Sequence, residues 1–449
     1  MDFIPSTDSD RREMLEDIGV DSLEELFSDI PDDLKVESNL VDGQGETELE
    51  LKESVKKIAD RNEKPGDRLN LIGAGLYDHF IPSVVSHVTG RSEFYSAYTP
   101  YQAEISQGTL TWMFEFQTEI AELTGMDIAN SSMYDGGSSA AEAVLLAQEY
   151  LGKDKVVVSE TLNPRYRDVI ETYLPLEEKQ VIELGSDQGR IDRDQLDEIL
   201  TGEDSIAGLV VQSPNYLGVI ENLGGLKEKL EDSFLIVSSN PISLGLLEPP
   251  GSFGADIVVG EGQPLGNPMN FGGPLLGLFA TRKDYLRYLP GRVSGRTVDA
   301  DGNQGYVMAL QTREQHIKRE RATSNICTNQ ALNALAATVY LASLGPSGLK
   351  SLAKINWDKA HYLAEELTAL PGIELAWDQP FFNEFAIKVS GDPSNVWEKM
   401  KEKGIDLLHP DHLKEAGLKD LLLVAVTEKV KKGEMDEFVR LMRAEVESK

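Results

Sequence analysis

The sequence predicts an α/β protein with a doubly wound, mostly parallel sheet, and three observations lead to this prediction. Between residues 110 and 282, short β-branched or apolar runs alternate with helical stripes. Apolar runs bounded by helices are typical of parallel strands buried on both faces and joined by right-handed crossovers. Beyond residue 329, mixed strand and helix patterns indicate a smaller C-terminal α+β domain. Ahead of both, capping residues indicate an N-terminal helical arm.

The arm is assigned to residues 1–60. Thr7 or Asp8 is placed to cap a first helix that ends at Gly19, and Asp21 is placed to cap a second, shorter one. Such an arm has too little surface to fold alone, so we expect it to pack on the body or on a neighbouring subunit. The run at 42–46 is the obvious flexible patch.

The large domain is assigned to residues 61–328. Its predicted helices cover 112–123, 140–150, 194–200 and 223–230, and its predicted strands cover 156–158, 181–182, 209–211, 234–237, 257–259 and 275–280. The last two strands are joined by a stretch rich in glycine.

The helical linker and small domain are assigned to residues 329–449. A long helix is predicted over about 329–370, broken near Gly345 and Pro346. Strands are predicted at 373–377, 385–389 and 421–426, and helices at 396–403 and 435–446.

Composition excludes several classes of protein. The chain of 449 residues is 41% hydrophobic and 27% charged, which is typical of a folded globular protein. Its net charge of −33 opposes binding to nucleic acid, which requires a basic surface. The sequence leaves the cause of this acidity open. Without an apolar stretch near ~18 residues or a signal-peptide layout, no membrane contact is predicted and a cytoplasmic location is expected.

The single cysteine, Cys327, excludes an internal disulfide and fits a reducing compartment. Because free cysteines are usually buried and inert, a structural thiol is expected there. Two histidine pairs, His79 with His87 and His409 with His412, lack a third ligand. We therefore predict no metal site.

A cationic segment from Thr312 to Gln330 stands out on so acidic a chain. Its cations outnumber its carboxylates: Arg313, Lys318, Arg319 and Arg321 against Glu314 and Glu320. Such a segment either binds acidic groups of another element, subunit or ligand, or forms a solvated helix face that pairs with itself. His316 lies beside these arginines, and a surface or interface histidine is expected there rather than an acid–base group.

The run from Tyr95 to Gly108, called here the tyrosine loop, combines aromatic and amide side chains. It carries Tyr95, Tyr98, Tyr101, Gln102, Glu104 and Gln107 around Pro100. A loop of this kind either closes over a small polar ligand or forms a packed corner with satisfied hydroxyls.

Another short loop is placed to bind an anion. Gly136, Gly137, Ser138 and Ser139 precede an alanine-rich helix, where free N–H groups and the helix dipole favour phosphate or carboxylate. Simple capping by Ser138 or Ser139 explains the same residues.

Several of these segments resemble those of a known protein family. The tyrosine loop, the cationic segment, Gly254–Glu261 and Pro290–Arg292 closely resemble the glycine-cleavage P-protein family, glycine dehydrogenase (decarboxylating). The resemblance runs from Met1 to the C-terminal helix, and it is to the α subunit, subunit 1, of the two-subunit form.

The resemblance implies the fold-type I of pyridoxal-phosphate-dependent transferases. That fold holds the cofactor with a helix N-terminus for the phosphate, an Asp for the pyridine nitrogen and a Lys for the Schiff base. This sequence has Asn240 near the expected Asp and no lysine from Glu231 to Arg282. The chain is therefore expected to have no catalytic residue of its own, with Gly136–Ser139 as a vestigial anion loop.

The resemblance also implies a role and partners. The complete enzyme decarboxylates glycine, releases CO2 and transfers the aminomethyl group to the lipoyl arm of H-protein. Pyridoxal phosphate is held covalently by P-protein subunit 2, in a heterotetramer of two copies of each subunit. From this chain, active-site or interface walls are expected to be formed by Tyr95, Tyr98, Tyr101, Gln102, Gln107, Arg313, His316, Arg319 and Arg321. Two alternatives stay open: an autonomous enzyme that uses Lys283 or Lys318, and a purely structural pseudoenzyme.

Overall fold

The computed structural model describes residues 6–36, 45–63, 66–95, 97–174, 180–415, 418 and 420–447. The chain divides into two compact units, Met1–Lys64 and Pro65–Lys449. Most of the flexible patch predicted at 42–46 lies outside the described residues. The domain limits predicted at 60 and 328 stay predictions.

The first unit consists of short helices with strong N-terminal caps. They are α1 (Asp8–Ile18), α2 (Glu48–Ala59) and the 3-10 turns η1 (Glu24–Phe27) and η2 (Asp32–Leu34). Thr7 caps α1 through a capping box with Asp10, and Gly19 ends the helix in the left-handed conformation. The cap predicted at Asp21 is wrong, because the Ser22 hydroxyl accepts the Glu25 N–H instead. Neither α1 nor α2 buries a residue, so the predicted packing of the arm stays a prediction.

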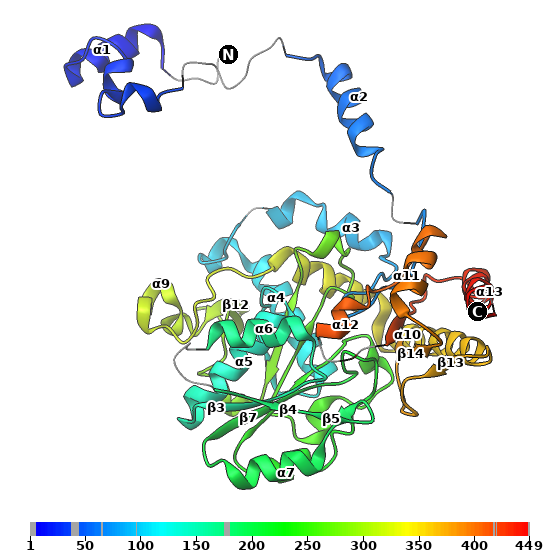
Figure 1. The fold of residues 1–449 in the computed structure, drawn as a ribbon. Coiled ribbons are helices and arrows are strands. Elements are labelled where there is room, and N and C mark those ends of the chain that lie inside the picture. The colour runs from blue at the N-terminus through cyan, green and yellow to red at the C-terminus, as the bar shows by residue number, and fades with distance from the viewer. Residues whose placement is uncertain are drawn as a thin grey trace. The chain divides into compact units, whose positions relative to one another are not determined.

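The second unit is built on a seven-stranded sheet with the order β2-β10-β9-β8-β7-β3-β4 (Figure 1). Its strands are β2 (Ile128–Ala129), β3 (Lys155–Ser159), β4 (Val181–Leu184), β7 (Ile206–Gln212), β8 (Phe234–Ser238), β9 (Ile257–Glu261) and β10 (Gly277–Thr281). The run from β9 through β4 is parallel, as predicted. β10 is antiparallel to β9, because their connection contains no helical crossover that would return the chain to the same end of the sheet.

Helices cover both faces of this sheet (Figure 1). They include α3 (Ser83–Thr89), α4 (Gln107–Thr124), α5 (Gly136–Leu151), α6 (Pro164–Tyr173), α7 (Arg193–Gly202) and α8 (Leu226–Leu230). Alternation along each strand separates two apolar cores: Val157 and Leu209 face a core with α4, whereas Val156 and Val210 face the core with α5. The four helices predicted in this region are confirmed, and α3 and α6 are additional.

The helical linker and the small sheet match the sequence pattern closely. The long helix α10 (Ala331–Thr368) carries a break at Gly345, with φ +62°, just before Pro346. An antiparallel sheet follows, formed by β13 (Ile373–Leu375), β14 (Glu384–Val389) and β16 (Leu421–Ala425), with α11 (Pro393–Glu402), α12 (Asp411–Glu415) and α13 (Lys432–Glu447).

Shorter strands complete the second unit. β11 (Val293–Val298) and β12 (Gln304–Ala309) form a hairpin, as do β5 (Ser186–Asp187) and β6 (Arg190–Ile191). β1 (Leu69–Asn70) pairs with β15 (Ile405–Asp406), so the chain just after the arm joins the C-terminal part of the fold. In the described part of the chain, no helix has both the length and the apolarity needed to cross a membrane.

Candidate functional site

The tyrosine loop and the cationic segment meet in space. The rings of Tyr101 and His316 lie 5.4 Å apart between centroids. The guanidinium carbon of Arg292 lies 6.0 Å from the centroid of the Tyr101 ring. Two segments far apart in the sequence therefore form one surface. Arg292, which lies next to this surface, was not among the site residues predicted from the sequence.

Gln107 fixes the tyrosine loop to the hairpin. It begins α4, and its amide nitrogen donates to the Ala103 carbonyl at 2.7 Å and to the Tyr306 carbonyl at 2.9 Å. Its amide oxygen accepts the Tyr306 N–H at 2.8 Å. With both amide atoms bonded to backbone, Gln107 positions the loop and is not free to contact a ligand.

The other loop residues have separate environments. Tyr98 is 84% exposed and Tyr101 is 49% exposed, which is unusual for aromatic side chains in a packed corner. Gln102 is exposed and precedes the 3-10 turn η4 (Ala103–Ile105). Tyr95 ends the turn η3 (Ser92–Tyr95), and its side chain lies outside the described part of the structure.

The cationic segment is not one helix. It is broken into η9 (Gln311–Arg313), α9 (Gln315–Lys318) and η10 (Arg319–Arg321). One break lies at Glu314, whose backbone is extended, and the other at Arg319, whose φ of +55° is incompatible with a continuous right-handed helix. The segment is therefore not a continuous helix face, although its second half is solvated and Arg321 pairs with Glu320. Its arginines differ in environment: Arg313 is buried, whereas Arg319 and Arg321 are exposed.

A cluster of buried charges lies beneath this surface. Arg313 donates to the Gly291 carbonyl at 2.7 Å, and Arg292 donates to the Cys327 carbonyl at 2.8 Å. Burial lowers the pKa of Arg313 to about 10. Burial also raises the pKa of Glu314, against the opposing charges of His316, Arg292 and Arg313. The carboxylate of Glu314 lies 3.6 Å from the His316 ring nitrogen.

This cluster is incompletely satisfied. Among the described residues, Nε of Arg292, Nε of Arg313 and Oε1 of Glu314 are buried and have no hydrogen-bond partner. Buried polar atoms are nearly always hydrogen-bonded, so three such atoms in one cluster indicate a missing partner. An ordered water, a ligand or a group of another chain would complete such a cluster.

A cavity of about 400 Å³ adjoins the cluster. Its lining combines apolar walls with polar groups and includes Tyr98, Trp112, Arg292, Asn329 and Gln330. This size and mixture are typical of a small-molecule site. Of the lining residues, only Tyr98 was among the predicted site residues, while Arg292 was noted within the Pro290–Arg292 motif alone.

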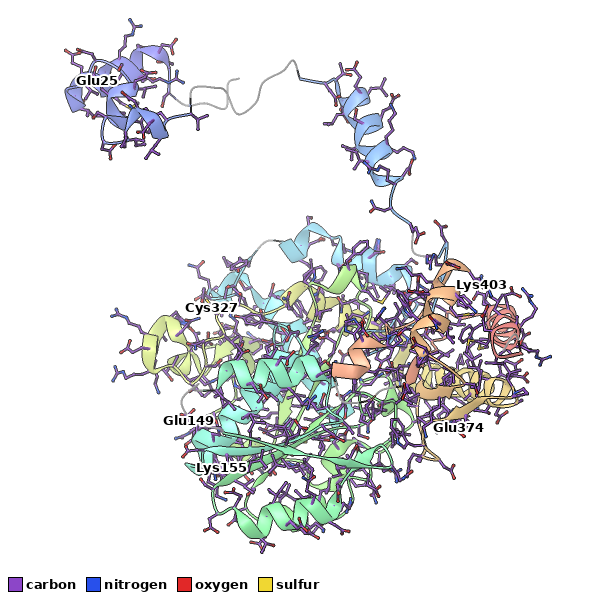
Figure 2. The ribbon with its side chains drawn as sticks, viewed as in Figure 1. Glu25, Glu149, Lys155, Cys327, Glu374 and Lys403 are labelled. Atoms are coloured by element: carbon purple, nitrogen blue, oxygen red, sulfur yellow. The ribbon has the colours of Figure 1, made fainter. Side chains whose placement is uncertain are left out.

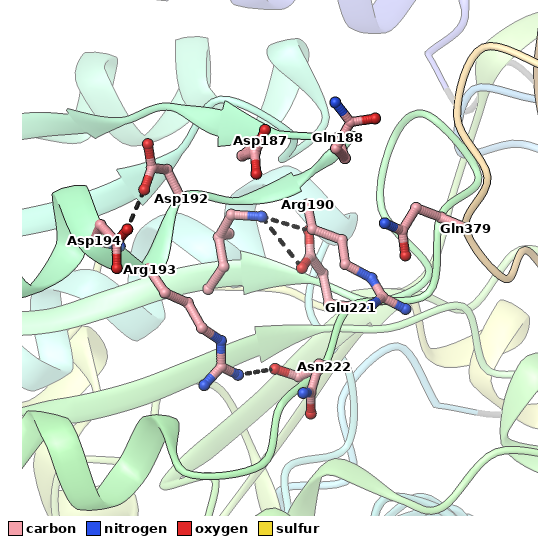
Figure 3. Close-up of a pocket in the computed structure, with 10 residues that line it drawn as sticks. Asp187, Gln188, Arg190, Asp192, Arg193, Asp194, Glu221, Asn222 and Gln379 are labelled. Carbon is pink, nitrogen blue, oxygen red and sulfur yellow. Dashed lines mark hydrogen bonds between the residues drawn. The ribbon is translucent and has the colours of Figure 1, made fainter.

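A second cavity, of about 350 Å³, lies beside α7 (Figure 3). Its two arginines are bonded to backbone: Arg190 donates to the Ile220 carbonyl and Arg193 to the Gly224 carbonyl, each at 3.0 Å. Glu221, in its floor, accepts the Asn215 amide at 2.9 Å. None of its described lining residues has a buried polar atom without a partner. These bonds tie Arg190 of β6 and Arg193 of α7 to the loop that follows β7, and we assign this cavity a structural role.

The anion loop at the start of α5 is closed by groups of the chain itself. Asp135, not Ser138 or Ser139, is the N-cap, and its carboxylate accepts the Ser138 N–H at 2.7 Å. The Gly136 N–H donates to Glu261 at 3.0 Å. Tyr166 packs so closely that a methyl group added at Gly136 would overlap its hydroxyl.

Pyridoxal phosphate therefore does not fit this chain's own version of the site. The N–H groups of Gly136 and Ser138 at the helix start are already bonded within the chain, and no lysine occurs from Glu231 to Arg282. Asn240, near the expected Asp, uses its side-chain oxygen to accept the Ile242 N–H at 3.0 Å. No reaction step is assigned to the cofactor within this chain alone.

The expectation of a buried thiol is also wrong. Cys327 is exposed (Figure 2), because the neighbouring Ile326 takes the buried position in this extended stretch. The Cys327 backbone N–H donates to the Tyr134 hydroxyl at 3.3 Å, so the backbone is held while the thiol faces outward.

Residues 1–442 match the family described as "Glycine cleavage system P-protein". The chain is 48% identical to the probable glycine dehydrogenase (decarboxylating) subunit 1 of Oceanobacillus iheyensis, over 98% of each chain. It is 46% identical to the protein of the same description from Carboxydothermus hydrogenoformans, over 98% of this chain and 99% of that one.

Solved structures agree with this match. A crystal structure of glycine decarboxylase, the P-protein of the glycine cleavage system, in inhibitor-bound form is 39% identical, with a TM-score of 0.86 over 99% of this chain and 100% of that one. A sphingosine-1-phosphate lyase from Burkholderia pseudomallei is 16% identical with a TM-score of 0.67 over 92% and 93% of the two chains, a likeness of fold only. The predicted fold-type I architecture is confirmed.

Proposed function

Because the chain belongs to the glycine cleavage system P-protein family, we propose that it is the subunit without a cofactor in a two-subunit, cytoplasmic glycine dehydrogenase (decarboxylating). The complete enzyme removes CO2 from glycine and transfers the aminomethyl group to the lipoyl arm of H-protein. Pyridoxal phosphate, held covalently by a lysine of subunit 2, supplies the electron sink for this reaction. The assembly contains two copies of each subunit.

One observation carries the proposal: in the cluster of Arg292, Arg313 and Glu314 one buried polar atom of each side chain has no hydrogen-bond partner, and Arg292 lines the adjoining cavity. A guanidinium with an unused N–H is a donor for a carboxylate or phosphate group. Since the chain's own cofactor site is closed, the group that completes the cluster comes from the second subunit or from a ligand that it holds.

The tyrosine loop has a matching role in the assembly. Tyr98 lines the cavity yet is 84% exposed, so its ring is available to a second surface. Aromatic side chains at such positions exclude water and orient polar ligands. Tyr101 lies against His316 at the rim, and the Glu314 carboxylate lies 3.6 Å from that imidazole nitrogen.

The autonomous alternative is not favoured by the position of its lysines. Lys283 follows β10 beyond Thr281, whereas Gly277, at the other end of that strand, packs against Asp135 at the start of α5. Four residues of strand separate these ends by about 13 Å. Lys318 is exposed in α9, so neither amine lies at the start of α5.

Glycine–bicarbonate exchange tests the proposal. The chain alone should be inactive, and activity should appear on mixing with the lysine-bearing subunit. Exchange by the isolated chain would contradict the assignment. The variant Tyr98→Ala distinguishes a subunit that contributes to the active site from a purely structural scaffold. The variant should still assemble with the second subunit, but its exchange activity should fall. Full exchange activity in the assembled variant would favour the scaffold.

A further inference from the structure

Glu261 occupies an unusual position at the end of β9. Its side chain is buried, with 6% exposure, and accepts three backbone N–H groups. The donors are Gly136 at 3.0 Å, Gln263 at 2.9 Å and Leu276 at 2.9 Å. Three donors converging on one buried carboxyl form a site for an anionic group, and here the group is part of the chain.

Among these three donors, the Gly136 N–H is the one that lies at the start of a helix. Gly136 is the first residue of α5, a helix of 16 residues, whose aligned peptide dipoles favour an acceptor at this end. In the fold that the chain shares with pyridoxal-phosphate-dependent enzymes, this end of the helix receives the cofactor phosphate. We propose that the Glu261 carboxyl is a built-in substitute for that phosphate, and that it keeps this chain's own cofactor site closed.

The surroundings leave no space for a second occupant. Tyr166, on α6, lies against Gly136 and carries its hydroxyl to the same end of α5. On the opposite side, a methyl group at Gly277 would lie 2.5 Å from both the Asp135 carbonyl and the Ser139 hydroxyl. The start of α5 is thus enclosed between α6 and β10, and Glu261 enters from the sheet below.

The position of the Glu261 carboxyl opposes an external anion as well. It already accepts the Gly136 N–H, and the Asp135 carboxylate accepts the Ser138 N–H in the same first turn. The chain therefore satisfies this helix end internally, and Glu261 occupies the place that a phosphate would need.

The same carboxyl anchors a buried chain of hydrogen bonds. Gln263, held by Glu261, accepts the Tyr77 N–H and donates to the Tyr77 carbonyl, both at 3.1 Å. The Tyr77 hydroxyl donates to Glu384 on β14 at 2.7 Å. Through Gln263 and Tyr77, the Glu261 carboxyl therefore also links the large sheet to the C-terminal sheet.

Inorganic phosphate is the probe that tests this inference, with the full-length chain and thermal unfolding at constant ionic strength. Wild type should show no saturable response. Glu261→Ala exposes the Gly136 N–H and a space beside it, so saturating phosphate should raise its unfolding temperature by on the order of a few degrees. Glu261→Ser, which keeps a small acceptor and should show the same response, replaces it if the alanine variant does not fold.

Two further variants assign the effect. Glu221→Ala removes another buried carboxyl, which accepts the Ile191 backbone N–H and the Asn215 side-chain amide but not an N–H of α5, and it should gain no phosphate response. Tyr166→Ala removes the neighbouring ring but leaves Glu261 bonded, and it should also gain none. An equal response in wild type, Glu261 variants and Glu221→Ala would overturn the proposal, as would a response in Tyr166→Ala alone. These outcomes do not depend on glycine exchange, so this proposal and the proposed function fail separately.

Discussion

Arg313 and Arg319 belong to one short segment but have opposite environments. Arg313 is buried and bonded to the Gly291 carbonyl, whereas Arg319 is exposed at the break between two turns. Residue type alone predicts equal roles for them. Burial separates a cation that supports the fold from one that is available to a partner.

Substitution should reveal this difference. Arg313→Ala leaves the buried Gly291 carbonyl without its donor and removes a buried positive charge near Glu314, so the free energy of unfolding should fall by about 2–4 kcal/mol. Arg319→Ala should change it by less than about 0.5 kcal/mol but weaken association with the second subunit. Urea denaturation and sedimentation of the mixed subunits measure the two effects. Equal destabilisation by both variants would contradict the account.

Glu384 provides a prediction on pH. Burial raises its pKa from 4.5 to about 7, against bonds from the Ala74 N–H and the Tyr77 hydroxyl. The fold therefore favours the protonated carboxyl, and this contribution is present below the ordinary pKa and lost as pH rises through about 7. The loss amounts to about 3 kcal/mol.

Glu384→Gln removes the titration while keeping an acceptor and a donor of similar shape. Relative to wild type, the variant should therefore gain stability between pH 5 and pH 8. Urea midpoints across that range measure the gain, and Glu374→Gln, on the neighbouring strand but exposed, is the control. A wild-type minus variant difference that does not change with pH would show that Glu384 is not protonated in the fold.

At the scale of elements, α10 joins two cores. Residues up to Ala353 pack in the core of the large sheet, and residues from Ala360 pack in the core of the C-terminal sheet. The break at Gly345 changes the helix direction in the first part, with φ +62° and ψ 177°. Only glycine adopts this conformation without strain.

Gly345→Ala should therefore destabilise the chain by about 1–3 kcal/mol, although a methyl group at Gly345 meets no atom within 4 Å. Gly433→Ala, in α13, is the matched control, because it also has open space but has no positive φ. That control should be neutral or slightly stabilising. Chemical denaturation compares them, and a neutral Gly345→Ala would mean that the break is not required.

Sequence patterns predicted the elements whose signal is local. The central strands and α10 have long apolar runs and clear breaks, so their existence and order were predictable. α6 begins with Asn163 as its cap and Pro164 as its first residue, a signal that would have located it. The β11–β12 hairpin carries glycine and exposed polar residues, which hide its alternation.

The candidate site was predictable only in part, because it is formed by contacts between segments that are distant in the sequence. The tyrosine loop and the cationic segment were recognised as unusual, but their meeting through Tyr101 and His316 depends on the fold. Arg292 and Glu261 have no local pattern that marks them. Their roles follow from burial and from partners that tertiary structure brings together.

At the scale of the whole molecule, the second unit has a complete fold and an incomplete site. Its sheets are packed and its own cofactor site is closed by Glu261, Asp135 and Tyr166. The buried polar atoms that lack a hydrogen-bond partner in the cluster of Arg292, Arg313 and Glu314 lie instead beside the cavity that Arg292 lines. This separation is what a subunit requires if it contributes walls to a reaction centre held by its partner.

Borohydride reduction tests this central claim most directly. Borohydride traps pyridoxal phosphate irreversibly on the lysine that holds it, and peptide mapping then locates the label. In the assembled enzyme the label should lie wholly on the second subunit, and the isolated chain should yield no labelled peptide from residues 231–282. Stoichiometric label on Lys283 or Lys318 of this chain would contradict the account and establish an autonomous enzyme.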